Sequence, residues 1–369
     1  MHFFDHAAQH FGTAPYAQMT LTVWLLVLLA LFFDFLIGFH VSANSVATVV
    51  STRVLTPQMA VLWAAFWNFM AFLFFHLKVA GTMGTGIIDP GIVDNRVIAA
   101  ALIGACAWDI ITWYWGLPTS SSHALIGGMI GAALAKSVSV FQPTAEHAAW
   151  VELLLDPAKS PLGWAGIGKT LLFILLAPLI GFAIGWTIAL AVMWTFRKAP
   201  PRRVDGIFRK GQLVSAAFYS LGHGGNDAQK TMGIIFVLLI ATSREAGIAA
   251  PADVPTEVVM ACYIAMGIGT LFGGWRIVKT MGQKIIKLRP VDGFSAEVGA
   301  AATLVMTVVG GIPVSTTQTI TGSIVGVGSL KRASAVHWGV AGQVVWAWIL
   351  TIPGAALVSA TSWWLLRWM

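Results

Sequence analysis

The sequence predicts an all-α polytopic membrane protein made of two inverted-topology repeats, with broken helices and re-entrant hairpins rich in proline, serine and threonine. Composition indicates the class, because 57% of the residues are hydrophobic and 10% are charged, against about 25% charged residues in soluble proteins. A recurring phrase indicates the repeat: Gly-Leu-Pro-Thr-Ser-Ser-Ser-His at 116–123 returns as Gly-Ile-Pro-Val-Ser-Thr-Thr-Gln at 311–318. Both copies interrupt apolar sequence, as expected for a chain with two related halves.

The apolar stretches are long enough for bilayer-spanning helices, which need about 20 residues. The clearest are 21–36, 59–77, 97–115, 170–196, 258–277 and 335–366. The first nineteen residues contain no lysine or arginine, which argues against a cleaved signal peptide. The two cysteines, Cys106 and Cys262, both lie in apolar segments, so neither a disulfide framework nor a zinc site is expected.

The positions of the charges give the expected topology. The net charge of +7 comes mainly from short basic loops at 197–210, 276–289 and 331–332. This distribution argues against a nucleic-acid partner and instead indicates cytoplasmic loops, since short Lys/Arg-rich loops stay in the cytoplasm. The remaining loops, at 89–94, 146–156 and 245–257, are acidic. We therefore expect residues 1–19 to lie outside.

Threading the chain between these loops gives the same order twice with opposite polarity, which defines an inverted repeat. In the first half, 20–53 crosses inward, 57–77 returns, 97–136 enters and comes back, and 162–196 crosses inward. The corresponding segments are 212–243, 257–278, 296–330 and 335–366. The predicted division is a first transmembrane repeat at 1–196, a basic cytoplasmic linker at 197–211 and a second transmembrane repeat at 212–369. Charge parity leaves open whether 97–136 and 296–330 are re-entrant hairpins or pairs of full spans.

The recurring phrase has the chemistry of an oxyanion site. Pro118 is expected to end one helix and the following serines to cap the next, whose free N–H groups carry about half a positive charge. The serine and threonine hydroxyls add rotatable donors. Two such helix starts that converge near the midplane would form a neutral, donor-rich site for a tetrahedral oxyanion. The residues concerned are Ser120, Ser121, Ser122, Ser315, Thr316 and Thr317.

A second pair of motifs carries ionisable groups: 38–44 and 224–230. Both are expected to be glycine-marked helix breaks, with helix resuming at Met232 in the second. An aspartate inside a membrane span, here Asp227, is by default a candidate functional residue. His223 is a candidate proton carrier because histidine titrates near physiological pH. Lys230 is expected either to balance Asp227 structurally or to share its function.

Five ordered phrases, at 38–53, 116–123, 222–230, 293–297 and 311–317, resemble the PiT-type inorganic phosphate transporters, especially their bacterial low-affinity permease branch. The resemblance covers essentially the whole chain. It implies secondary active import of inorganic phosphate by cation symport, with protons favoured over sodium and phosphate held between the two hairpin tips. By position it implies substrate binding by Ser120, Ser121, Ser122, Ser315, Thr316, Thr317 and Asn226, and cation coupling by Asp227, His223, Asn44 and Glu297. Under sodium coupling, Asp227, Asn226 and Asn44 would be the metal ligands.

The resemblance also implies the surroundings of the protein. It implies a multi-pass location in the bacterial inner membrane, contact with lipid, and no cofactor other than the co-transported H+ or Na+. The substrate is inorganic phosphate, either free or as a metal–phosphate complex, and a homodimer is left open. An enzyme would need a nucleophile, a base and an orienting group in fixed geometry. The motifs offer symmetric donors instead, so no enzymatic activity is expected.

Three positions depart from the family pattern. Ile37 and Val41 stand where relatives usually have asparagine and aspartate, and Gln318 stands where histidine is typical. Loss of one intramembrane carboxylate affects the expected coupling more than the expected substrate, since oxyanion binding by the hairpins does not need an acid at Val41. The alternatives are therefore a transporter of another oxyanion such as sulfate, or a phosphate carrier with altered coupling.

Overall fold

The computed structural model describes residues 19–89, 91–140, 160–331 and 333–368, and within these ranges the regular structure is helical apart from one isolated bridge between Ile88 and Leu162. The first half contains α2 (Leu21–Ser51), α3 (Pro57–Met70), η1 (Ala71–Leu73), α4 (Lys78–Thr85), α5 (Asn95–Trp115), α6 (Ser121–Val140) and α8 (Trp164–Thr195). The second contains α9 (Pro201–Glu245), α10 (Thr256–Phe272), α11 (Trp275–Lys279), η2 (Thr280–Lys284), α12 (Pro290–Val309), α13 (Thr316–Lys331), η3 (Ala333–Ala335) and α14 (Trp338–Leu366).

The prediction of an all-α multi-pass membrane protein is confirmed. In the described ranges, five helices are long and apolar enough to cross a membrane, or up to seven if each of two bent helix pairs counts as one span. Side chains of α8 and α14 are the least buried of these, with 17% and 28% of the apolar window inside the protein. Their exposed residues are mostly leucine, isoleucine and tryptophan. These two helices therefore present apolar surface to lipid.

The predicted helix breaks at 38–44 and 224–230 are wrong, because α2 and α9 each run through them without interruption. A glycine in a helix interior costs roughly 1 kcal/mol relative to alanine, but here it permits close helix packing. A Cβ added at Gly38 would lie 2.1 Å from the Met266 carbonyl oxygen, and one at Gly224 would lie 2.3 Å from the Asn68 carbonyl oxygen. Small residues serve this purpose at membrane helix interfaces.

The broken spans lie elsewhere, one in each half. The α3–η1 segment bends by 88° into α4, and α10 bends by 61° into α11 and η2. The second bend contains Gly273, whose φ of 64° is in the left-handed region that glycine adopts readily. The inverted-repeat prediction assigned single spans to these segments, whereas the chain breaks each span into two helices of different direction.

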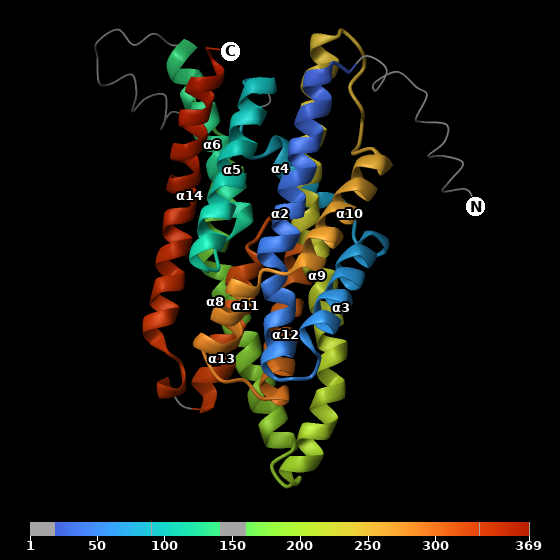
Figure 1. Cartoon of the computed structure of the whole chain (residues 1–369), viewed down its shortest axis with the longest axis vertical. Coiled ribbons are helices and arrows are strands. Elements are labelled where there is room, and N and C mark those ends of the chain that lie inside the picture. Colours follow the sequence, from blue (N-terminus) through green and yellow to red (C-terminus); the bar gives the residue numbers. More distant parts are fainter. Residues whose placement is uncertain (1–18, 90, 141–159, 332, 369) are drawn as a thin grey trace, which may run out of the picture.

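Two helical hairpins, α5–α6 and α12–α13, occupy opposite ends of the molecule, with α5–α6 in the upper half and α12–α13 in the lower half of Figure 1. Each hairpin turns at a glycine with φ of 66°, Gly116 in one and Gly311 in the other. The carbonyl oxygen of Gly116 accepts a hydrogen bond of 3.0 Å from Thr280, and that of Gly311 accepts one of 2.8 Å from Thr82. Each turn is thus held by the broken span of the other half.

The last helix of each half packs against the hairpin of the other half. The α8 helix packs on α12 and α13, while α14 packs on α5 and α6. Glycines make this contact close: a Cβ at Gly322 would lie 2.1 Å from the Pro178 carbonyl oxygen, and one at Gly127 would lie 2.4 Å from that of Ile352. The predicted division into 1–196 and 212–369 therefore describes the order of the repeats along the sequence. It does not separate two packing units, since each half packs against the hairpin of the other.

The basic segment 197–211, which the sequence analysis treated as a linker, is helical for most of its length. The α9 helix begins at Pro201, the first-turn position that proline favours, and continues for 45 residues. This helix and α8 form the lower end of the molecule (Figure 1). A hydrophilic sequence can remain helical here because the same helix is anchored further along by its buried 215–239 segment.

Candidate functional site

The tips of the two hairpins touch in the interior of the protein. The Thr317 hydroxyl donates to the Thr119 carbonyl oxygen at 3.0 Å, and the Ser122 hydroxyl donates to the Val314 carbonyl oxygen at 3.5 Å. Thr119 and Val314 occupy the same place in the recurring phrase, as do Ser122 and Thr317. The two contacts are thus one contact made twice, which is what an internal two-fold relation requires.

The first hydroxyl of each triplet caps a helix. Ser120 Oγ accepts from the backbone N–H of His123 at 3.3 Å, and Ser315 Oγ accepts from that of Gln318 at 3.2 Å. Both are the interaction of an N-cap residue with the third helical position. The beginnings of α6 and α13 are therefore fixed next to each other, each with a partial positive charge from its helix dipole.

One face of α9 supplies charged groups to the same place. Asp227 Oδ1 accepts from Lys230, while Oδ2 accepts from the Thr316 hydroxyl at 2.8 Å. His223 Nε2 lies 3.1 Å from the same Oδ2 atom. His223, Asp227 and Lys230 are all buried, so these charges interact with little solvent screening.

The α2 helix contributes Asn44 to the second tip. Its Nδ2 atom donates to Thr316 Oγ1 at 3.2 Å and to Thr317 Oγ1 at 2.9 Å. The neighbouring Ser45 hydroxyl lies 3.1 Å from His223 Nδ1, and Asn68 Oδ1 lies 3.1 Å from the same nitrogen. These contacts fix the imidazole ring, so that its other nitrogen faces Asp227.

Asn226 and Gln318 are buried polar side chains without an internal partner. Neither the nitrogen nor the oxygen of either amide makes a hydrogen bond within the described part of the chain, and both residues are 0% exposed. The Ser121 hydroxyl is also buried and makes no hydrogen bond of normal geometry, although it faces the buried Asp109 carboxylate. Because an unsatisfied buried polar group costs about 1–3 kcal/mol, such groups at the starts of α6 and α13, and next to Asp227 along α9, indicate a site for a polar ligand.

Glu297 does not join the tips. Its carboxylate accepts from the Ser215 hydroxyl and from Gln212 Nε2 at 3.0 Å, both on α9. Ser215 precedes Asp227 by twelve residues, or about 18 Å along a helix. Gln212 in turn accepts from Thr52 at 2.9 Å, so Glu297 belongs to a separate buried polar group nearer the basic end of α9.

Sequence reasoning missed part of this network. Asn68 and Ser45, which position His223, and Thr119, which bonds across the tips, were not singled out as site residues. An intramembrane asparagine was a usable signal for Asn68. Ser45 gave none, since an isolated hydroxyl in an apolar helix more often bonds its own backbone. Thr119 lies within the recurring phrase, but it takes part through its backbone carbonyl oxygen, which any residue at that position would supply.

The three departures from the family pattern lie in two different settings. Ile37 and Val41 are buried in the apolar cluster that surrounds α2, 1% and 2% exposed. Neither introduces a polar group, so the first half has no carboxylate at the position that corresponds to Asp227. Gln318, by contrast, lies directly after the hydroxyl triplet of the second tip.

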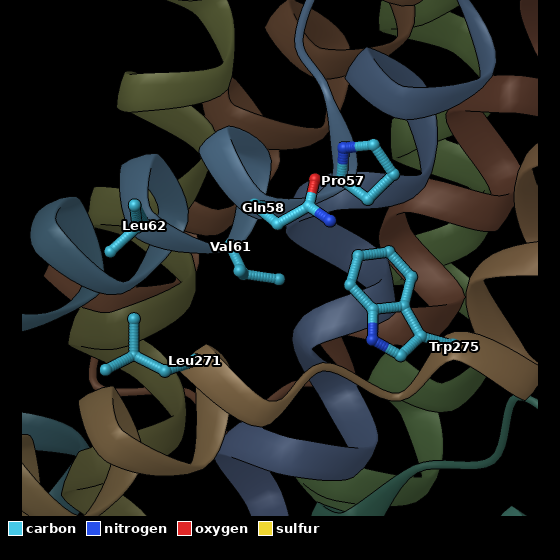
Figure 2. A pocket seen from close by; sticks show the side chains of 6 residues that line it. All are labelled: Pro57, Gln58, Val61, Leu62, Leu271 and Trp275. Atoms are coloured by element: carbon cyan, nitrogen blue, oxygen red, sulfur yellow. The ribbon is translucent and has the colours of Figure 1, made fainter.

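The structure also has a surface groove of about 470 Å³, but it is not part of the polar site. It lies between α3 and the bend of α10 into α11, and is lined by Pro57, Gln58, Val61, Leu62, Leu271 and Trp275 (Figure 2). Its walls are mainly apolar and it is widely open. Among the described residues, no three His, Cys, Asp or Glu side chains are grouped as ligands for a metal ion.

Comparisons with known proteins agree on one family. Residues 37–359 match the pattern of the "Phosphate transporter family". A "Probable low-affinity inorganic phosphate transporter" of Rhizobium meliloti (strain 1021) is 55% identical over 335 residues, or 91% of this chain and 93% of the relative. A protein of the same name from Bacillus subtilis (strain 168) is 41% identical over 345 residues, or 93% and 96% of the two chains.

The fold has a counterpart among solved structures. One named "The sodium-dependent phosphate transporter" superposes with a TM-score of 0.79 over 95% of this chain and 100% of that chain, at 22% sequence identity. At this identity the similarity concerns the arrangement of the helices. It supports the inverted repeat with two hairpins.

Proposed function

The chain belongs to the phosphate transporter family, and from this premise we propose that it imports inorganic phosphate across the bacterial inner membrane by cation symport. The family and the relatives are transporters, so the protein is a membrane transporter and not an enzyme. The proposed orientation places residues 1–19, of which 1–18 lie outside the described ranges, on the outer side. The basic ends of α8 and α9 would then face the cytoplasm, as the positive-inside rule requires.

The meeting of the two hairpin tips supports phosphate binding between them more than any other observation does. Two helix starts with hydroxyl residues are adjacent in the interior, and the Ser121 hydroxyl of the first makes no internal hydrogen bond. The buried amide of Asn226, next to Asp227 along α9, makes none either. Helix N-termini and hydroxyl donors are the groups that bind oxyanions. We propose Ser120, Ser121, Ser122, Ser315, Thr316, Thr317 and Asn226 as the substrate-binding residues.

Phosphate binding would have to open the tips. The hydroxyls of Thr316, Thr317 and Ser122 all donate to groups of the protein, so a phosphate oxygen would replace these acceptors. For Thr317 and Ser122, exchange of a neutral carbonyl acceptor for a charged phosphate oxygen is favourable, because hydrogen bonds to ionised groups are roughly twice as strong as neutral ones. Thr316 already donates to the Asp227 carboxylate and would exchange one charged acceptor for another. Since the two hairpins come from opposite ends, separation of their tips is a natural route to alternating access.

The groups around Asp227 support proton coupling. His223 Nε2 lies 3.1 Å from Asp227 Oδ2, and the other ring nitrogen is held by Asn68 and Ser45. A histidine fixed against a carboxylate is a candidate proton carrier. Tyr219 stacks on His223 with ring centroids 6.1 Å apart and donates to the Thr316 carbonyl oxygen at 3.4 Å. Along α9 it lies one turn from His223 and one turn from Ser215, the partner of Glu297. We propose His223 and Asp227 as the main coupling residues, Asn44 as their link to the second tip, and Glu297 as a proton acceptor nearer the cytoplasm.

The second candidate function is transport of another tetrahedral oxyanion, such as sulfate. It is favoured by one observation: hydroxyls and helix N-termini recognise shape and charge, but do not require a protonated oxygen on the anion. A phosphate carrier with altered coupling remains the other alternative, because Val41 gives the first half no acid. Metal–phosphate transport and a homodimer also stay proposals. Asp227, Asn226 and Asn44 would be the sodium ligands only if coupling were to sodium, which is not the coupling proposed here.

Uptake of labelled phosphate into proteoliposomes, with the pH and sodium gradients varied independently, tests the proposal. Proton symport predicts accumulation with an inward proton gradient in sodium-free medium. Unlabelled sulfate at excess should leave this uptake unchanged. Accumulation of sulfate in preference to phosphate would reject the proposed substrate, and uptake driven by sodium alone would reject proton coupling.

A further inference from the structure

We propose that Lys230 is a resident cation: its ammonium group fills, in the second half of the protein, a cation site made by oxygen atoms of α9 and of both hairpin tips. Sodium therefore has no place at this site during transport. The inference rests on the proposed function and deepens it, because it specifies which cation balances Asp227 and which ions are excluded there.

The contacts of the ammonium group are those of a bound metal cation. Lys230 Nζ donates to Asp227 Oδ1, to the Ser122 hydroxyl, and to the Val314 carbonyl oxygen at 2.8 Å. These are a carboxylate, a hydroxyl and a backbone carbonyl, supplied by α9 and by the two hairpin tips. Oxygen atoms of these kinds are the ligands of hard cations, and freed carbonyls at broken helices coordinate the driving cation in other transporters.

The internal symmetry shows that this cation replaces a neutral group. Asn44 follows Gly38 by six residues, and Lys230 follows Gly224 by six residues. Asn44 Nδ2 contacts the second hairpin at Thr316 and Thr317, while Lys230 Nζ contacts the first hairpin at Ser122. Ser122 and Thr317 are themselves equivalent. The amide and the ammonium group therefore occupy corresponding places, and only the second half carries a charge there.

Sodium cannot share these oxygens with Lys230. Lys230 is 0% exposed and its Nζ atom is in direct contact with all three ligands. A second monovalent cation would overlap with it and would meet an unscreened like charge. Asp227, meanwhile, is already balanced by one positive charge. The protein thus needs no sodium ion to neutralise its buried carboxylate.

Replacement of the tethered cation by free cations tests the proposal. In proteoliposomes that contain the full chain, proton-driven uptake of labelled phosphate should be the same in sodium and in choline medium. Lys230→Ala removes the ammonium group and leaves room beside its three ligands. It should lower uptake in choline medium by about tenfold or more, as expected for loss of a charge-assisted contact. Sodium or methylammonium should restore much of this loss.

Lys230→Met is the matched control, because its side chain fills the space without a charge. Its uptake should be as low as that of Lys230→Ala in choline medium, and sodium should not restore it. Thermal unfolding in detergent gives a readout that does not depend on transport. Sodium should raise the Tm of Lys230→Ala, since a ligand that binds the folded state stabilises it, and should leave the Tm of the wild type and of Lys230→Met unchanged.

The outcomes against the proposal are distinct. Wild-type uptake that requires sodium would overturn it, as would Lys230→Ala uptake equal to that of the wild type. A folded Lys230→Ala protein with low uptake in both media, and with a Tm insensitive to sodium, would assign Lys230 to phosphate itself and also overturn it. If Lys230→Ala does not fold, Lys230→Asn, which copies Asn44, is judged by the same criteria. Absence of wild-type phosphate uptake under every gradient would instead reject the proposed function, and the Tm series would still decide on Lys230.

Discussion

Asp227→Asn should destabilise the protein and abolish uptake driven by a cation gradient. Both oxygens of Asp227 are engaged: Oδ1 accepts from Lys230, and Oδ2 accepts from Thr316 at 2.8 Å and faces His223 at 3.1 Å. The substitution keeps the shape of the side chain but leaves a buried ammonium group without its counter-charge. Removal of one partner from a buried ion pair costs about 3–5 kcal/mol, which is a large part of the stability of a typical domain.

Two measurements separate the effects on stability and on coupling. Denaturant unfolding in detergent should show the loss of about 3–5 kcal/mol, and Asp253→Asn, which changes an exposed carboxylate, should show almost none. Proteoliposomes should show loss of gradient-driven uptake, while counterflow of labelled phosphate between equal concentrations reports on carrier function without a net driving cation.

The double substitution Asp227→Asn with Lys230→Met provides the internal control. It removes both buried charges, and a neutral replacement of a buried ion pair is often close to the wild type in stability. Stability should therefore return while driven uptake stays lost. Wild-type driven uptake by Asp227→Asn would refute the coupling role, and an unfolding free energy within about 0.5 kcal/mol of the wild type would refute the ion-pair argument.

Three further predictions follow from individual contacts. Ser121→Ala should weaken phosphate binding about ten- to hundredfold, because it removes one charge-assisted donor whose hydroxyl makes no internal hydrogen bond. The control is Thr242→Val, which removes another unpaired hydroxyl about 22 Å further along α9 than Asp227. Equal effects of the two substitutions on phosphate affinity would contradict the site. Gly322→Ala should lower the free energy of unfolding by about 1–3 kcal/mol through overpacking, because the added Cβ would lie 2.1 Å from the Pro178 carbonyl oxygen. Gly168→Ala is the control, because a Cβ there has nothing within 4 Å. It should be neutral or stabilising in the same unfolding assay. Val41→Asp places a carboxylate in an apolar cluster of the first half and should change the ratio of gradient-driven uptake to exchange; an unchanged ratio would count against the coupling role of the acid.

The recurring phrase predicted the meeting of the hairpins because proline, glycine and hydroxyl residues act locally. Gly116 and Pro118 end α5, and Ser120 caps α6 within the same few residues. Charge parity of the loops then set the opposite orientation of the two hairpins. Both signals are short-range or additive along the chain, so a single sequence contains them.

The features that could not be predicted depend on contacts between distant segments. Glycines at 38 and 224 were interpreted as helix breakers, since propensity disfavours them in a helix, but tertiary packing against Met266 and Asn68 requires them. The first actual break, at 74–77, contains no glycine or proline, whereas the second, at 273–274, is a Gly-Gly pair that lay inside an apolar stretch interpreted as one span. Glu297 was expected with the coupling residues from the family resemblance, yet its carboxylate accepts from Ser215, twelve residues from Asp227.

The two halves make corresponding contacts at the hairpin tips but carry different charges there. At the two corresponding pairs of positions, the first half has Val41 and Asn44, and the second has Asp227 and Lys230. Each pair is neutral, in one case because neither residue is charged and in the other because the two charges cancel. An entering anion therefore meets no net charge from either pair, and its attraction comes from the helix starts and hydroxyls of the tips. A cation that compensates the charge of the anion must then accompany it. A proton bound to His223 or to the anion itself fulfils this role without the set of oxygen ligands that a metal cation requires.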